Sequence, residues 1–221
     1  PGVQFAAALA VGRVRYAPAL VRLQEMAAAQ GPDKRVYSGV IYALYRVGNT
    51  EHMKDMIRLL LHRQEEVRGN AVMVMGMLGL PSGVRPLEQG LLPDETDKTV
   101  MLQVVEALAM LGEEQYARKL EGYAREPFLD DRLMAVRAMG RLALPSYTPV
   151  LEDLLAHGRP WVQVAAAGAL ARMNQGSRRG ALLSVRALQH PRAPLVAEAD
   201  HPEQVTDEHV LELQPLAAVA L

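Results

Sequence analysis

The stretch EVRGNAVMVMGMLGLP, residues 66–81, decides the fold. Its apolar positions lie three or four residues apart and form one stripe along a helix: Val67, Ala71, Val74, Met75 and Leu78. Gly79 then favours the left-handed turn that ends a helix, and Pro81 cannot continue one. None of its side chains is chemically reactive. The stretch therefore indicates an architecture rather than an activity.

The end of this helix recurs every thirty-one to thirty-three residues along the chain. The residues that match Met75, Gly76, Leu78 and Gly79 are Leu44, Tyr45, Val47 and Gly48; Leu108, Ala109, Leu111 and Gly112; Met139, Gly140, Leu142 and Ala143; and Leu170, Ala171, Met173 and Asn174, with a looser copy that ends at Gly12. Prolines mark the joints at a similar spacing, at positions 1, 32, 93, 127, 160 and 191. The chain is therefore built from an internal repeat.

Each period has room for a second helix. These second helices are expected over residues 16–30, 51–64, 82–92 and 115–126, and after Ser146 and Ser177. Thr50 is a good N-cap for the one that begins at Glu51. Pro86 and Gly90 interrupt the segment from Ser82, so the helix there should be short or kinked.

Two helices in about 31 to 33 residues are typical of an α-solenoid. The sequence predicts an all-α, right-handed solenoid of about six hairpins over residues 1–190, followed by a non-repeat tail over 191–221. The predicted repeats cover residues 1–31, 32–64, 65–93, 94–126, 127–159 and 160–190. One hairpin buries too little apolar surface to offset the entropy of ordering it, so neighbouring repeats must stack.

The string Val67-Arg68-x-x-Ala71-x-x-x-Met75-Gly76-x-Leu78-Gly79 resembles HEAT repeats, as do its copies from Arg132 and Val162. It is similar to the short HEAT-like repeat named after phycobilisome lyases, and the resemblance covers residues 2–190. Tetratricopeptide and ankyrin signatures are absent from the sequence. The resemblance implies a scaffold whose second helices line the concave side.

Composition and motifs argue against several classes of activity. The net charge of -1 creates no field that would recruit nucleic acid, and the absence of cysteine removes thiolate chemistry and disulfides. No apolar run is long enough to cross a membrane. The His-Glu dipeptides of deoxyhypusine hydroxylase-like proteins are missing, and basic and acidic residues alternate where DNA glycosylase-like solenoids carry a basic groove. Phycobilin lyases fit the repeat and stay an alternative.

The six histidines are scattered, and no phosphate-binding or nucleophile motif is present, so the sequence predicts no catalytic residue, cofactor or metal site. A group formed by His190, Asp200, His201, Glu203 and His209 would require the tail to fold back. The candidate residues are instead partner-binding residues on the second helices and on the tyrosine-rich helix of the second repeat, where at least one tyrosine should be exposed. They are Arg22, Tyr42, Tyr45, His52, Arg58, Arg85, Arg118 and Lys119.

Both ends are informative. The first helix, residues 3–11, is apolar all round, whereas a capping repeat needs a polar outer face. Further repeats, the tail or a second chain should therefore cover it. Leu195, Val196 and the apolar residues from Val210 to Val219 predict that the tail docks on the repeats.

We interpret the chain as a non-catalytic scaffold or adaptor that binds another protein on its second helices. The alternative is an accessory subunit or lyase-like HEAT protein that assists an enzyme or the attachment of a cofactor. Neither the partner nor the compartment follows from the residues: a soluble protein of this kind functions in the cytoplasm or, if a leader was removed before Pro1, outside it.

Overall fold

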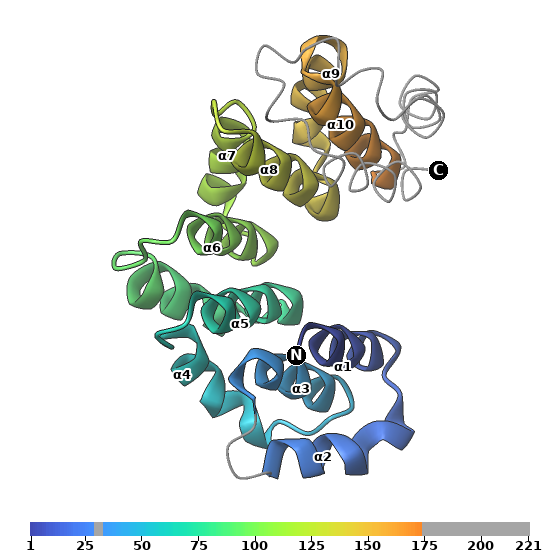
Figure 1. Ribbon diagram of the computed structural model, residues 1–221, viewed down its shortest axis with the longest axis vertical. Coiled ribbons are helices and arrows are strands. Elements are labelled where there is room, and N and C mark those ends of the chain that lie inside the picture. Colours follow the sequence, from blue (N-terminus) through green and yellow to red (C-terminus); the bar gives the residue numbers. More distant parts are fainter. Residues whose placement is uncertain (29–32, 174–221) are drawn as a thin grey trace. The chain divides into compact units, whose positions relative to one another are not determined.

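The computed structural model describes residues 1–28 and 33–173, and every regular element in these two ranges is a helix (Figure 1). The chain divides into two compact units, Pro1–Ala117 and Arg118–Leu221. The predicted all-α class is confirmed. The second helix expected after Ser177, the histidine and acidic group of the tail, and the tail itself lie outside the described residues.

Unit 1 is a row of helical hairpins. Its first helices are α1 (Gly2–Val14), α3 (Lys34–Arg46), α5 (Glu65–Leu78) and α6 (Lys98–Met110). Its second helices are η1 (Ala17–Ala19) with α2 (Leu20–Ala28), η2 (Glu51–Asp55) with α4 (Met56–Leu60), and η3 (Pro81–Gly83) with the π-helical η4 (Pro86–Leu91). Helix α1 packs on α3, α3 on α5, and α5 on α6. Helix α2 packs on α3, and α4 packs on α3 and α5.

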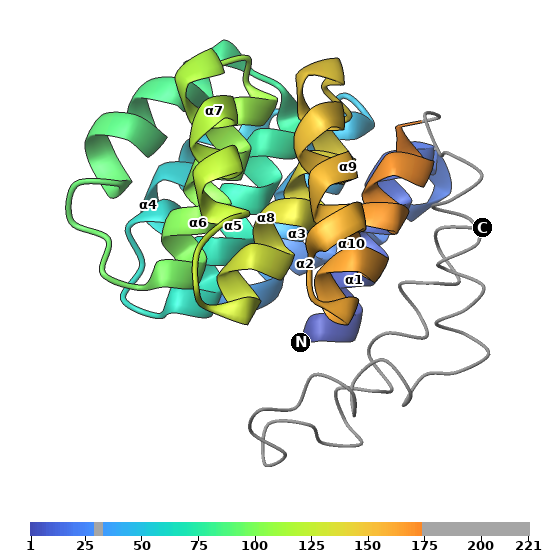
Figure 2. The same cartoon turned by 90° about the horizontal axis from the view of Figure 1, so that it is seen from above.

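Unit 2 repeats this arrangement. It contains α8 (Leu129–Leu142), η5 (Pro145–Tyr147), α9 (Thr148–His157) and α10 (Pro160–Arg172). Helix α10 packs against both α8 and α9, and α9 and α10 lie side by side in Figures 1 and 2. Helix α7 (Glu114–Tyr123) crosses the boundary between the units.

The glycine near the end of a first helix permits close packing with the next first helix. A Cβ added to Gly76 would lie 3.0 Å from the Cα of Ala107, and one added to Gly140 would lie 2.8 Å from the Cα of Ala169. In α1 the structure places Gly12 at the position of Gly76, not at that of Gly79 as the looser copy in the sequence suggests, and a Cβ on Gly12 would lie 2.6 Å from the ring of Tyr42. The periodic glycine of the sequence is therefore a contact between successive hairpins.

Helices α1, α5 and α8 end in a left-handed residue, as the periodic Gly79 predicts, and in α3 and α6 the left-handed glycine follows one residue later. Gly79 has a φ of 66°, and at the matching position Arg15 and Ala143 adopt φ values of 52° and 51°. An L-residue in this conformation costs about 1–2 kcal/mol. The repeat therefore imposes its geometry even where the sequence lacks glycine.

One predicted second helix is shorter than expected, and another has the irregular form that the sequence predicts. The helix predicted over residues 51–64 starts as a 3₁₀ turn and ends at Leu60. Beyond this end, the Arg68 guanidinium binds the carbonyl oxygens of His62 and Arg63 at 2.9 and 3.0 Å. The segment from Ser82 is short and irregular, as predicted. Pro86 opens a π-helical turn in which the Leu92 N–H donates to the carbonyl of Leu87.

Candidate partner-binding surface

Successive second helices of unit 1 carry the same local pattern, a β-branched residue followed by arginine. In α2 the pair is Val21-Arg22, and in α4 it is Ile57-Arg58. The segment before η4 repeats it as Val84-Arg85. Each pair is followed, within two residues, by a buried leucine that anchors the element: Leu23, Leu59 and Leu87. We call the three pairs the arginine ladder.

The arginine ladder faces solvent. Val21 is 67% exposed and Ile57 is 42% exposed, although both are apolar. The Arg58 side chain is 87% exposed, and Arg22 and Arg85 are exposed as well. Helices α2 and α4, which carry the first two pairs, follow the lower and left border of unit 1 in Figure 1. The pattern therefore presents apolar and basic groups together at the surface of one unit.

Each arginine of the ladder has a weak partner three or four residues away in its own repeat. Arg22 pairs with Glu25 at 3.0 Å, and Arg58 lies 3.8 Å from Asp55. The Arg85 Nε donates to the side-chain oxygen of Gln89 at 3.1 Å. Exposed pairs of this kind contribute only about 0–1 kcal/mol. A carboxylate from another protein can therefore replace these partners at little cost.

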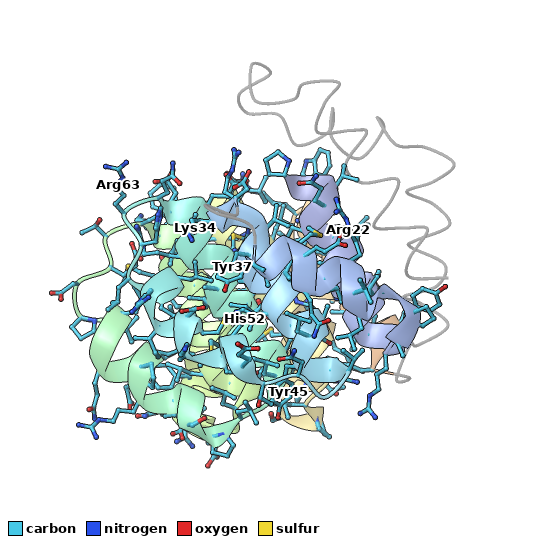
Figure 3. All side chains as sticks on the ribbon, turned by 90° about the horizontal axis from the view of Figure 1, so that it is seen from below. Arg22, Lys34, Tyr37, Tyr45, His52 and Arg63 are labelled. Carbon is cyan, nitrogen blue, oxygen red and sulfur yellow. The ribbon has the colours of Figure 1, made fainter. Side chains whose placement is uncertain are left out.

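His52 lies in a hydrogen-bonded cluster beside the ladder. The Tyr37 hydroxyl on α3 donates to Asp55 at 2.8 Å and lies 3.0 Å from the Nδ1 of His52 (Figure 3). Burial raises the pKa of Tyr37 above its ordinary value, and the hydrogen bond to Asp55 adds to the effect. Because Asp55 also lies 3.8 Å from Arg58, the cluster helps to position the arginine of the second ladder pair.

The tyrosines of α3 take different roles. Tyr42 is only 2% exposed and packs against Gly12, with the Arg46 guanidinium 5.9 Å from its ring centroid. The expectation that Tyr42 lies on the binding surface is therefore wrong, because α1 covers this face of α3. Tyr37 is buried too, whereas Tyr45 is half-buried.

Arg118 and Lys119 lie on α7 at the start of unit 2, and both side chains are exposed. They share a helix with exposed acidic residues, as the alternating charges of the sequence indicate. They belong to a different unit from the arginine ladder. Of the predicted partner-binding residues, those that are at least partly exposed in unit 1 are Arg22, Tyr45, His52, Arg58 and Arg85.

An ion pair that the sequence did not reveal joins helix α5 to the loop before α6 in unit 1. Arg68 holds Glu95 with two hydrogen bonds, at 2.6 and 2.8 Å, and the Glu95 side chain is 1% exposed. Burial by itself would raise the pKa of Glu95. Hydrogen bonds from Arg68 and from the N–H groups of Asp97 and Thr96 outweigh that effect, so this pKa lies below its ordinary value. No periodic signal marks Glu95, because it stands in a loop.

This ion pair borders an open pocket of about 610 Å³ lined by polar loop residues, among them His62, Arg63, Asp94 and Asp97. Within residues 1–28 and 33–173, no three histidine, aspartate or glutamate side chains are grouped so that they would hold a metal ion. Nor does any helix in those ranges have the length and apolar character that a bilayer crossing requires.

Comparison with known proteins supports the architecture. Residues 26–109 match the family model of HEAT repeats. This part of the chain therefore carries HEAT repeats, as the recurring Val-Arg and Met-Gly positions predicted. No curated protein matches the sequence significantly.

A solved structure shares the fold. The complex of CpcE and CpcF of phycocyanin lyase from Nostoc sp. PCC7120 matches with a TM-score of 0.50 and 19% sequence identity. The match covers 100% of this chain and 90% of that one. At this identity the likeness concerns the fold.

Proposed function

We propose that this protein is an accessory HEAT-repeat subunit, without catalytic residues of its own, that holds a partner protein on the arginine ladder of unit 1. The observation that carries the proposal is the ladder itself. Arginine and a β-branched residue recur together on successive second helices, and in α2 and α4 the β-branched residue is exposed, where a structural role would leave it buried. Exposed apolar side chains grouped with basic ones mark interaction surfaces.

The chemistry of the ladder defines the partner's surface. Val21 and Ile57 offer apolar contact, and Arg22, Arg58 and Arg85 offer guanidinium groups that bind carboxylates with two parallel hydrogen bonds. An acidic, amphipathic helix provides both complements at helical spacing. We therefore expect the bound segment to carry aspartate or glutamate beside leucine, valine or isoleucine.

The likeness to CpcE and CpcF favours an accessory role in a lyase-type assembly over that of a general adaptor. Those two chains form a complex of phycocyanin lyase. By analogy, we propose that this chain acts with a second protein and assists the attachment of a cofactor to a client. Tyr37 and Glu95, whose pKa values are shifted, form hydrogen bonds that join separate elements of the fold. Their shifts thus accompany a structural role, which fits a protein that binds a partner and has no catalytic residues of its own.

The experiment is affinity capture from cells that make the protein, with quantitative mass spectrometry. The wild type is compared with a triple variant, Arg22→Glu, Arg58→Glu and Arg85→Glu. The control is a second triple variant, Arg13→Glu, Arg15→Glu and Arg63→Glu, which reverses the same charge at exposed positions outside the ladder. We expect the ladder variant to lose the acidic partner and the control to keep it. Equal recovery with both variants would refute the proposal.

The lyase-like and plain scaffold hypotheses predict different masses for the client protein. We expect the captured client to carry a covalent cofactor in wild-type cells and to lack it when this chain is deleted, as measured by intact-protein mass spectrometry. A client whose mass is the same in both cells would support the plain scaffold instead.

A further inference from the structure

The open pocket beside the Arg68–Glu95 ion pair is a cavity that the arginine ladder does not include, and we call it the loop pocket. One wall comes from the end of α4 and the start of α5, and the other comes from residues 90–97. Its volume of about 610 Å³ lies within the range of ligand pockets, about 300–1,000 Å³. Both walls belong to the middle of unit 1, so the loop pocket is not an end face on which a further repeat would stack.

The loop pocket carries an excess of negative charge. Arg68 and Glu95 neutralise each other in its wall. The only other arginine of the lining, Arg63, is exposed and points away from the ribbon (Figure 3). Three further carboxylates line the pocket, and within residues 1–28 and 33–173 none of them forms an ion pair: Glu65, Asp94 and Asp97.

These carboxylates already act on a cation in the wall of the loop pocket. The hydrogen bonds to Glu95 raise the pKa of Arg68, and the charges of Glu65 and Asp97 add to this rise. Asp97 is held in place because its Oδ1 accepts from the Val100 N–H at 2.8 Å, as the N-cap of α6. The pocket therefore stabilises positive charge with groups that are in position before a ligand binds.

An exposed apolar side chain connects the loop pocket to the arginine ladder. Leu61 lines the pocket and is 60% exposed. Its N–H donates to the carbonyl of Ile57 at 3.3 Å, so the two side chains follow helical spacing and lie on one side of α4. Ile57 belongs to the ladder and is exposed as well. A segment that covers the ladder at α4 thus continues over Leu61 to the pocket.

We propose that the loop pocket receives an arginine or lysine side chain from the same protein segment that the arginine ladder holds. This inference rests on the proposed function and adds a recognition element to its partner. The aliphatic stem of such a side chain packs on Leu61, and its charged head binds the carboxylates of Glu65, Asp94 and Asp97. Because the ladder selects carboxylates and the pocket selects a cation, the two together fix the direction in which the segment lies.

A small probe tests the loop pocket by itself. N-acetylarginine amide is titrated into the isotope-labelled full chain, and N-acetylcitrulline amide, its uncharged counterpart, is the ligand control. We expect saturable shifts of the backbone amide NMR signals of residues 62–65 and 94–97 with the arginine probe and none with the citrulline probe. Equal shifts with both probes would overturn the inference. So would absent shifts, which also result if an arginine of this chain's own residues 174–221 fills the pocket.

Matched charge reversals separate the loop pocket from its surroundings. Glu65→Lys reverses a charge of the lining, whereas Glu66→Lys reverses the next charge in the same first turn of α5, outside the lining. Both variants lose the same interaction with the helix N-terminus, so their melting temperatures should agree. Glu65→Lys and the loop variant Asp94→Lys should weaken binding of the arginine probe at least about tenfold, and Glu66→Lys by less than about twofold. Equal weakening by Glu65→Lys and Glu66→Lys would overturn the inference.

Capture of the partner separates this inference from the proposed function. We expect Asp94→Lys to lower the recovery of the partner that the ladder variant loses, and Glu66→Lys to keep it. If Asp94→Lys keeps the partner while the ladder variant loses it, the inference fails and the proposed function stands. If the ladder variant keeps its partner, the proposed function fails, and the link between the pocket and the ladder fails with it.

Discussion

Replacing Glu95 by leucine should destabilise unit 1 more than any other single loss of a carboxylate that the structure describes in this unit. Glu95 accepts two hydrogen bonds from Arg68, at 2.6 and 2.8 Å, and two from backbone N–H groups, of Thr96 at 3.0 Å and Asp97 at 2.9 Å. Leucine fills a similar volume but accepts none of them. The variant would leave the Arg68 guanidinium partly buried without its counter-charge.

The structure sets the magnitude. Removing one member of a buried ion pair costs about 3–5 kcal/mol. The Arg68 side chain keeps 15% of its surface exposed beside the open pocket, so water recovers part of the lost interaction. We therefore expect about 3 kcal/mol, at the lower end of that range. For a chain of this size, that loss lowers the melting temperature by about 6–12 °C.

Urea unfolding followed by circular dichroism at 222 nm measures the effect. Asp94→Ala, a loss of a carboxylate exposed at the rim of the same pocket, is the control and should stay within about 0.5 kcal/mol of the wild type. The double variant Arg68→Met with Glu95→Leu should recover about 1–3 kcal/mol relative to additive losses. Additive losses, or a Glu95→Leu variant as stable as the control, would refute the assigned role of the pair.

Three further predictions concern the same framework. The folded-state pKa of Glu95 lies below the ordinary 4.5, so its contribution to the free energy of unfolding is present above about pH 4.5 and is lost as the pH falls through the folded value. In urea titrations, the wild type should therefore lose stability below about pH 4.5 more steeply than Glu95→Gln. Parallel curves for the two proteins would contradict this. Gly140→Val should cost about 1–3 kcal/mol of stability in thermal melts because the added Cβ meets the Ala169 backbone. Gly122→Ala, in open space on α7, should instead raise the melting temperature. Equal shifts for the two variants would argue against close packing of α8 and α10. Tyr37→Phe should cost about 1–2 kcal/mol in urea unfolding by removing the hydroxyl shared by Asp55 and His52, and no difference from the exposed control Tyr16→Phe would count against that cluster.

The repeat could be predicted from the sequence because packing between hairpins leaves a periodic trace. Gly76 and Gly140 stand where helices approach, and the stripe of Val67, Ala71 and Met75 marks the buried face. The first helix is apolar on all sides in the sequence, and the structure leaves Val3 and Val14 of this helix exposed. Contacts that repeat in space are visible as residues that repeat in the sequence.

The surface could be predicted only in part, because exposure depends on which neighbour covers a face. Tyr42 looked available, but α1 packs over it through Gly12, a contact between residues thirty apart. Val21 and Ile57 are apolar, and only the structure shows that they are exposed. A repeated Val-Arg or Ile-Arg step was the signal for the ladder. The Arg68–Glu95 pair had no such signal, since a loop position without periodicity holds one of its members.

Hydrogen exchange of the purified complex tests the central claim, binding on the second helices of unit 1, most directly. Amide exchange is compared between the free chain and the chain saturated with its captured partner. We expect added protection in α2 (Leu20–Ala28), α4 (Met56–Leu60) and residues 84–91, and unchanged exchange in α9 (Thr148–His157). Protection confined to α9, with α2 and α4 exchanging as in the free chain, would contradict the account.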